Sequence, residues 1–192
     1  MNRVAATIFV AMLFAACVAP AARAADSYKV DPVHSAAVFR IRHANIGYVW
    51  GRFNDPGGTF TLDESDPAKS SFNVEIKVEN VDTHNAQRDT HLKSPDFFNA
   101  RQYPTISFKS TSVKKGEGNT LQATGALTIH GVTKTVTVPV ELTGKGQFPP
   151  GTARAGIEAT FVVKLADFEI KNMGGMVGEE ARVVVAMEGV KQ

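Results

Sequence analysis

The densest group of chemically active side chains lies between Thr83 and Asn99, in the stretch THNAQRDTHLKSPDFFN. It holds two histidines, two aspartates, an arginine and a lysine, which are residue types that transfer protons and bind anions. Asp89 with His91 would be a general acid–base pair, and Arg88 would bind a phosphate or carbonyl group. The same types are common in helix caps and surface ion pairs. We therefore predict no catalytic residue, and a small enzyme acting through Asp89 and His91 is the alternative hypothesis.

Metal and nucleophile motifs are not found in the sequence. The five histidines form no His-Glu-x-x-His motif, and no two of them stand two residues apart, as two ligands on one strand would. There is no Gly-x-Ser-x-Gly turn that would present a serine nucleophile. We predict neither a metal site nor a cofactor.

The first 24 residues have the pattern of a secretory signal peptide. Arg3 precedes an apolar run from Val4 to Val18, and Ala22-Arg23-Ala24 provides a cleavage site. Two of the 21 basic residues lie in this segment, so the predicted mature domain, residues 25–192, has 19 basic and 19 acidic residues. This neutral balance argues against a nucleic-acid partner. We predict one periplasmic domain without a disulfide, because the single cysteine, Cys17, lies in the signal segment.

Alternation of apolar and polar residues predicts strands over most of the mature domain. Phe72, Val74, Ile76 and Val78 alternate with polar residues, which gives one apolar and one solvated face. Similar runs recur between turn signals such as Asn54-Asp55-Pro56-Gly57-Gly58. About eight or nine such runs, several of them roughly 9 to 11 residues long, predict an all-β domain. The expected fold is an extended antiparallel eight-stranded barrel with room for one ligand in its lumen.

The aromatic residues distinguish two kinds of barrel. An outer-membrane barrel has similar alternation but carries girdles of tryptophan and tyrosine at both membrane interfaces. The mature domain has only Trp50 and three tyrosines, Tyr28, Tyr48 and Tyr103, without a repeating placement. We therefore predict a soluble barrel that does not span a membrane.

The segment from Asn85 to Asn99 interrupts the alternation and predicts a short helical insert between strands. Asn85 is a suitable N-cap for a helical turn through Leu92, and Ser94-Pro95-Asp96 has the cap, proline and acid of a second helix start. Phe97 and Phe98 supply an apolar anchor. The insert is expected at the barrel rim, where its charged residues shape the mouth.

Four segments together resemble the YceI-like family of exported lipid-binding proteins. They are Tyr28-x-x-Asp31-x-x-His34-Ser35 running into Phe39-x-Ile41-x-His43; Thr83 with Arg88-Asp89-x-His91-Leu92 and Asp96-Phe97-Phe98; Tyr103-Pro104-x-Ile106-x-Phe108; and Gly125-x-Leu127-Thr128-Ile129-His130-Gly131-Val132-Thr133-Lys134. Their order makes the match specific, and it covers nearly all of the mature domain. The resemblance implies a lipocalin-like antiparallel barrel whose apolar lumen holds a long isoprenoid chain, such as a polyprenyl lipid or a quinone tail.

Strand parity selects the residues that would contact this ligand. His43 ends the apolar face of the first long strand, so it is a polar group inside the lumen if that face points inward. The predicted contacts are Phe39, Ile41, His43, Val74, Ile76, Phe108, Leu127, Val138 and Phe161 in the lumen, with Arg88, Asp89 and His91 at the rim. We predict a binding protein for storage, transport or stress protection rather than an enzyme. The sequence leaves open the ligand's head group and whether the chain forms a homodimer.

Overall fold

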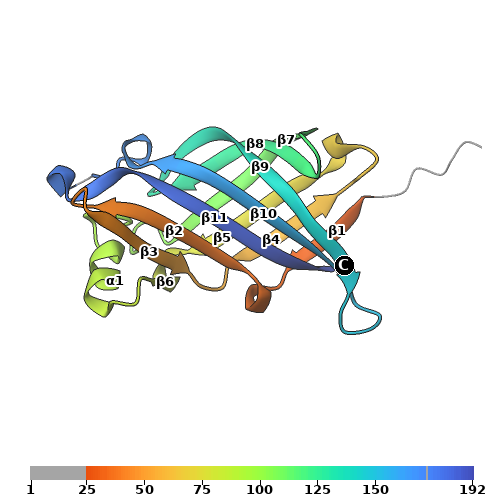
Figure 1. The fold of residues 1–192 in the computed structure, drawn as a ribbon, viewed down its shortest axis with the longest axis horizontal. Coiled ribbons are helices and arrows are strands. Elements are labelled where there is room, and N and C mark those ends of the chain that lie inside the picture. The colour runs from red at the N-terminus through yellow and green to blue at the C-terminus, as the bar shows by residue number, and fades with distance from the viewer. Residues whose placement is uncertain (1–24, 172) are drawn as a thin grey trace, which may run out of the picture.

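The computed structural model describes residues 25–171 and 173–192, and most of these residues form β-strands (Figure 1). The signal peptide predicted for residues 1–24 lies outside the described residues. The strands are β1 (Asp26–Val30), β2 (Ala36–His43), β3 (Gly47–Phe53), β4 (Gly57–Leu62), β5 (Ser71–Lys77), β6 (Val81–Asp82), β7 (Thr105–Lys115), β8 (Thr120–Ile129), β9 (Val132–Gln147), β10 (Ala153–Lys164) and β11 (Val177–Lys191). The helices are α1 (Ala86–Lys93) and the short 3₁₀ turns η1 (Pro32–His34), η2 (Pro67–Lys69), η3 (Val78–Asn80), η4 (Leu165–Phe168) and η5 (Met173–Gly175). Within the described residues, no helix has both the length and the apolar character needed to cross a membrane.

The strands form one antiparallel sheet that closes into a barrel (Figure 1). Eight strands make the closed ring, in the order β1, β4, β5, β7, β8, β9, β10 and β11, and β11 pairs back with β1. Strands β2, β3 and β6 continue the sheet from another part of the β11 edge. The predicted all-β fold with an eight-stranded antiparallel barrel is therefore confirmed.

The alternation in the sequence corresponds directly to the two faces of the barrel wall. In β8 every second side chain is buried, including Leu121, Ala123, Leu127 and Ile129, and the residues between them reach solvent. This is the period of a strand with one face on a core. Strands β9 and β11 have 16 and 15 residues. At about 3.3 Å per residue, a strand of this length spans roughly 50 Å, which makes the barrel tall.

The N-terminal segment that pairs with β11 is broken into two strands, β1 and β2. Both pieces pair with β11, β1 through Tyr28 to Val30 and β2 through Ala36 to His43. Asp31 accepts a hydrogen bond from the N–H of Val33 at 3.0 Å and so caps the short turn η1 between them. Strands β1 and β4 therefore complete the wall at one end of the molecule, and β2 and β3 complete it at the other.

Helix α1 lies at the end of the barrel next to β3 and β6 (Figure 1). Asn85 caps it as predicted, because its Oδ1 accepts from the N–H of Arg88 at 2.9 Å. The second predicted helix start, at Ser94, is wrong. The N–H groups of Phe97 and Asn99 both donate to Ser94 O, at 3.1 and 2.9 Å, and Asn99 has a φ of 47°. A left-handed residue reverses the chain, so the segment makes hydrogen-bonded turns instead of a helix.

Candidate functional site

A cavity of about 330 Å³ lies in the lumen of the barrel. Two clusters of buried apolar residues both contribute side chains to its wall, and Val74, Phe108 and Phe161 pack against both clusters. The structure brings together on the cavity wall all nine of the predicted lumen residues: Phe39, Ile41, His43, Val74, Ile76, Phe108, Leu127, Val138 and Phe161. Their contact with a ligand stays a prediction.

Neighbouring residues on one strand show which face points inward. On β5, Ile76 is on the cavity wall and is 7% exposed, whereas Lys77 is exposed on the outside. On β10, Phe161 is on the wall, whereas Val162 is 55% exposed. The positions that alternate with these exposed residues therefore form the interior of the barrel.

Several inward side chains keep accessible surface although they lie inside the barrel. Phe39, Val74, Phe108 and Phe161 are only partly buried, whereas Phe60, in the filled end of the barrel, is 1% exposed. A close-packed core leaves no such surface, so these four side chains border empty space. An apolar cavity offers water few hydrogen-bond partners, and burying its wall against a hydrocarbon is favourable by about 25 cal/mol per Å².

The wall also contains aromatic residues that strand parity did not select. Phe53, Phe97 and Phe98 line the cavity at the α1 end, and the rings of Phe53 and Phe98 meet edge to face with centroids 5.6 Å apart. Phe97 and Phe98 were expected to anchor the insert, and they extend into the wall as well. Gly51 pairs with Phe39 across β3 and β2, and a Cβ atom at Gly51 would overlap the Phe39 ring. The glycine therefore leaves room for an aromatic ring in the lumen.

The mouth of the cavity lies at the end of β2 and the start of β11. Arg42, His43, Met173 and Met176 line the cavity and are also exposed to solvent. His43 is therefore at the opening rather than deep in the lumen. The two methionines lie in the segment before β11, which has no strand periodicity, so sequence reasoning did not find them.

Arg88 and Asp89 hold the start of α1 to the barrel through Thr83, which is 5% exposed. Asp89 Oδ1 accepts from the N–H and the hydroxyl of Thr83, at 2.8 and 2.6 Å. Arg88 donates to Thr83 through Nε at 2.7 Å and through Nη2 to the Thr83 carbonyl at 2.6 Å. Arg88 also lines the cavity, but Asp89 does not. This network positions α1 at the cavity wall.

His91 is not placed as the partner of Asp89. Its Nε2 lies 3.0 Å from Asp96 Oδ2 in an exposed pair, and its ring meets Phe97 edge to face with centroids 5.0 Å apart. The structure thus gives Asp89 and His91 different hydrogen-bond partners. His91 contributes to the cavity wall next to Leu92.

A family model described as "YceI-like domain" matches residues 28–189. The chain belongs to the YceI-like family. It is 45% identical over 186 residues to Protein YceI of Escherichia coli and of Shigella flexneri, covering 96% of this chain and 95% of the relatives. It is 44% identical over 170 residues to Protein YceI of Salmonella newport, covering 88% of each chain. The predicted family is therefore confirmed.

Solved structures show the same YceI-like fold. BcnA of Burkholderia cenocepacia superposes with a TM-score of 0.76 at 23% identity, covering 83% of this chain and 98% of BcnA. The Campylobacter jejuni YCEI protein has a TM-score of 0.69 at 26% identity, covering 79% of this chain and 90% of that protein. A polyisoprenoid binding domain from Saccharophagus degradans has a TM-score of 0.66 at 14% identity, covering 86% and 98% of the two chains.

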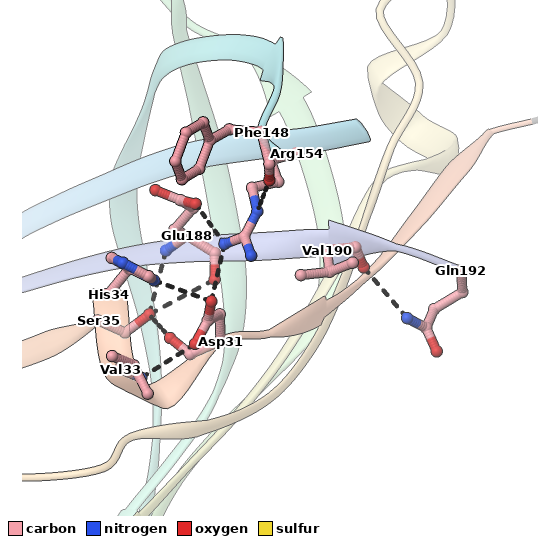
Figure 2. A network of polar contacts seen from close by, with 9 residues as sticks. All are labelled: Asp31, Val33, His34, Ser35, Phe148, Arg154, Glu188, Val190 and Gln192. Atoms are coloured by element: carbon pink, nitrogen blue, oxygen red, sulfur yellow. Dashed lines mark hydrogen bonds and ion pairs between the residues drawn. The ribbon is translucent and has the colours of Figure 1, made fainter. Parts of the chain in front are cut away.

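A second polar cluster of this YceI-like chain lies where β1 and β2 meet β10 and β11 (Figure 2). Arg154 Nη1 lies 2.7 Å from Asp31 Oδ2 and 2.6 Å from Glu188 Oε1. His34 Nδ1 lies 2.9 Å from the same Asp31 oxygen. The hydrogen bonds from His34 and Arg154 lower the pKa of Asp31 from 3.8 to about 2. His34 therefore contacts the same carboxylate that caps the η1 turn.

The same cluster also has the donor types of a metal site, since Asp31, His34 and Glu188 offer ligand atoms within 4.8 Å of one another. Arg154 already provides the positive charge that these carboxylates need, and its Nε additionally donates to the Phe148 carbonyl at 2.6 Å. A cation bound to Asp31 and Glu188 would repel the guanidinium between them. The arrangement fits a clamp that ties the break between β1 and β2 to β10 and β11.

Proposed function

We propose that this chain is a non-catalytic, exported binding protein that holds the hydrocarbon chain of an isoprenoid lipid in the barrel lumen. The ligand would be a polyprenyl lipid or a quinone tail, bound for storage, transport or stress protection. The observation that carries the proposal is a cavity whose inward aromatic and aliphatic side chains border empty space. A hydrocarbon tail would bury this surface without any catalytic group.

The comparisons support this proposal in two ways. A solved domain with the same fold is described as a polyisoprenoid binding domain. The chain also belongs to the YceI-like family, whose members in Escherichia coli and Shigella flexneri align over nearly their whole length. A periplasmic location is part of the proposal and rests on the signal sequence of residues 1–24.

The non-catalytic assignment rests on the partners of the candidate acid and base. Asp89 accepts hydrogen bonds from Thr83, and His91 is hydrogen-bonded to Asp96. Neither group therefore faces the other across a substrate position. An enzyme acting through this pair would require α1 and the turns after it to rearrange. The binding role requires no movement of these residues.

The first test is a measurement of lipid uptake by the delipidated protein. We expect native mass spectrometry to show one bound solanesol, a long polyprenol, and weaker retention of a long straight-chain primary alcohol, which has the same neutral head group. Protein purified from its own host should also carry a lipid. A barrel that stays empty with both probes would contradict the proposal, and equal retention of both would contradict the isoprenoid preference.

A pair of substitutions on β5 tests the lumen directly. Ile76→Glu places a charge on the cavity wall and should abolish solanesol uptake, whereas Lys77→Glu changes only the outer face and should leave it unchanged. Circular dichroism of both variants establishes that the barrel is folded. Equal effects of the two substitutions would refute the assignment of the inner face.

A further inference from the structure

Three exposed apolar side chains form a tip beside the cavity mouth. Ile46, in the turn between β2 and β3, is 87% exposed, and Met173 and Met176, in and next to η5, are 38% and 60% exposed. The N–H of Ala44 donates to Met176 O at 2.9 Å, so the two segments lie side by side. A protruding group of apolar side chains is unfavourable in water and indicates contact with an apolar medium or partner.

The turn that carries Ile46 is held in a defined conformation. Ala44 and Asn45 have φ values of 47° and 57°, and the N–H of Ile46 donates to His43 O at 2.9 Å. Arg42 Nη2 donates to Asn45 O at 3.1 Å. These bonds keep Ile46 from folding back onto the barrel, so its side chain remains exposed.

Aromatic and arginine side chains continue from this tip along the outer face of β2 and β3. Arg40 pairs in register with Trp50, and Arg42 pairs with Tyr48. Tyr48 is 52% exposed and Trp50 is 57% exposed. The Arg40 guanidinium lies 4.4 Å from the Tyr48 ring centre and 5.7 Å from that of Trp50. The face therefore combines exposed aromatic rings with positive charge.

Acidic residues lie close to this face, since Glu179 follows Gly178, which packs against Arg42. In residues 25–171 and 173–192, no carboxylate forms an ion pair with Arg40 or Arg42, and β11 places Arg182 opposite Arg40. On the same strand, Glu180 lies opposite Lys164. The arginines are thus available for an anionic partner.

We propose that this surface docks the cavity mouth onto an anionic phospholipid bilayer. We call it the docking surface, and it consists of Arg40, Arg42, Ile46, Tyr48, Trp50, Met173, Met176 and Arg182. Its tip would enter the apolar layer, its tyrosine and tryptophan would lie at the level of the head groups, and its arginines would contact lipid phosphates.

The docking surface lies beside the cavity mouth, so it would add lipid transfer from a membrane to the binding of lipid in the lumen. Arg42, Met173 and Met176 belong both to the docking surface and to the cavity mouth. A bilayer held there would let a hydrocarbon chain pass between membrane and lumen without crossing water. Ile46, Trp50 and Arg182 do not line the cavity, so their substitution separates docking from lipid binding.

Trp50 is the only tryptophan of the chain, and its fluorescence reports on the proposed contact. Full-length mature protein is mixed with vesicles of phosphatidylglycerol and phosphatidylcholine, or of phosphatidylcholine alone. We expect a blue shift and quenching by brominated lipid with the anionic vesicles only. Binding of equal strength to both kinds of vesicle would refute the role of the arginines, and no shift with either would refute docking.

Substitutions away from the lumen identify the surface. Ile46→Ser should reduce co-sedimentation with anionic vesicles, and Arg40→Gln combined with Arg182→Gln should weaken partitioning about 30-fold at low salt. Phe148→Ser is the matched control, because Phe148 is 72% exposed but lies in the β9–β10 turn at the opposite end of the barrel (Figure 1). Equal losses from Ile46→Ser and Phe148→Ser would contradict the docking surface.

Two further measurements distinguish this proposal from others. Solanesol uptake from detergent should be unchanged in Ile46→Ser, so a loss of vesicle binding in this variant tests docking alone. A loss of solanesol uptake without a loss of vesicle binding in Ile76→Glu tests the lumen alone. If the wild type fails to bind vesicles but self-associates in sedimentation analysis, and Ile46→Ser abolishes that association, the surface binds a second copy of the chain and the membrane proposal is wrong.

Discussion

The Asp31 clamp predicts a pH-dependent contribution to stability. Asp31 is 15% exposed and shares hydrogen bonds with His34 and Arg154, which together lower its pKa from 3.8 to about 2. At about 1.4 kcal/mol per pKa unit, this shift corresponds to an upper bound of about 2.5 kcal/mol of unfolding free energy. Asp31→Asn removes the charge and keeps the shape, so we expect a loss of about 2 kcal/mol at pH 7.

The sign of the pH effect follows from the direction of the shift. Because the folded pKa of Asp31 is lower than the unfolded value, the ionised group stabilises the fold above pH 3.8, and this stabilisation disappears as the pH falls to about 2. The difference between wild type and Asp31→Asn should therefore shrink over that window. Urea unfolding of both proteins at several pH values between 7 and 2 measures it.

A second turn of the chain provides a matched control. Asp66 also caps a short turn that begins with a proline, and it forms an ion pair with Lys69, three residues later. Both side chains are about half exposed, and no arginine of the described residues pairs with them. Asp66→Asn should cost less than about 0.5 kcal/mol. Equal losses in the two variants at pH 7, or a loss in Asp31→Asn that does not shrink below pH 4, would refute the clamp.

Two predictions concern α1 and the lumen. Asp89→Ala leaves the N–H and hydroxyl of buried Thr83 without their acceptor. We expect the free energy of unfolding to fall by about 1–3 kcal/mol and hydrogen exchange in α1 to become faster. Unchanged exchange in α1 would contradict the anchoring role. Ala159→Trp places a large ring on the cavity wall, so the folded protein should retain only shorter isoprenoid chains in native mass spectrometry, while Val162→Trp on the outer face should not change the accepted length.

The sequence could predict those parts of the molecule that depend on local patterns. Strand alternation is a local property, so the barrel and the inward side chains of β5, β8 and β10 follow from it. The cap at Asn85 is also local, because its partner is the N–H of Arg88. The second helix at Ser94 was wrong because a left-handed Asn99 reversed the chain, and Asn is only one of several residues that tolerate this conformation.

Features that depend on distant residues could not be predicted in this way. Arg154 lies 123 residues from Asp31 in the sequence, and no local spacing indicates that they meet. The same limit applies to Met173 and Met176, because the contact of their segment with the β2–β3 turn joins residues far apart in the sequence, as the hydrogen bond from Ala44 N–H to Met176 O shows. Asp89 and His91 looked like a catalytic pair because they are close in the chain, but their partners are Thr83 and Asp96.

The pairing of β11 has a consequence for the order in which the molecule can be completed. This strand is the last that the structure describes, and it pairs with β10 along one edge and with β1 and β2 along the other. Until residues 177–191 are present, β10 and the β1–β2 pair both have open edges, and the lumen has no wall between them. Residues 177–191 therefore close the wall of the lumen, and a chain that lacked them would leave the apolar interior open to water between β10 and the strands β1 and β2.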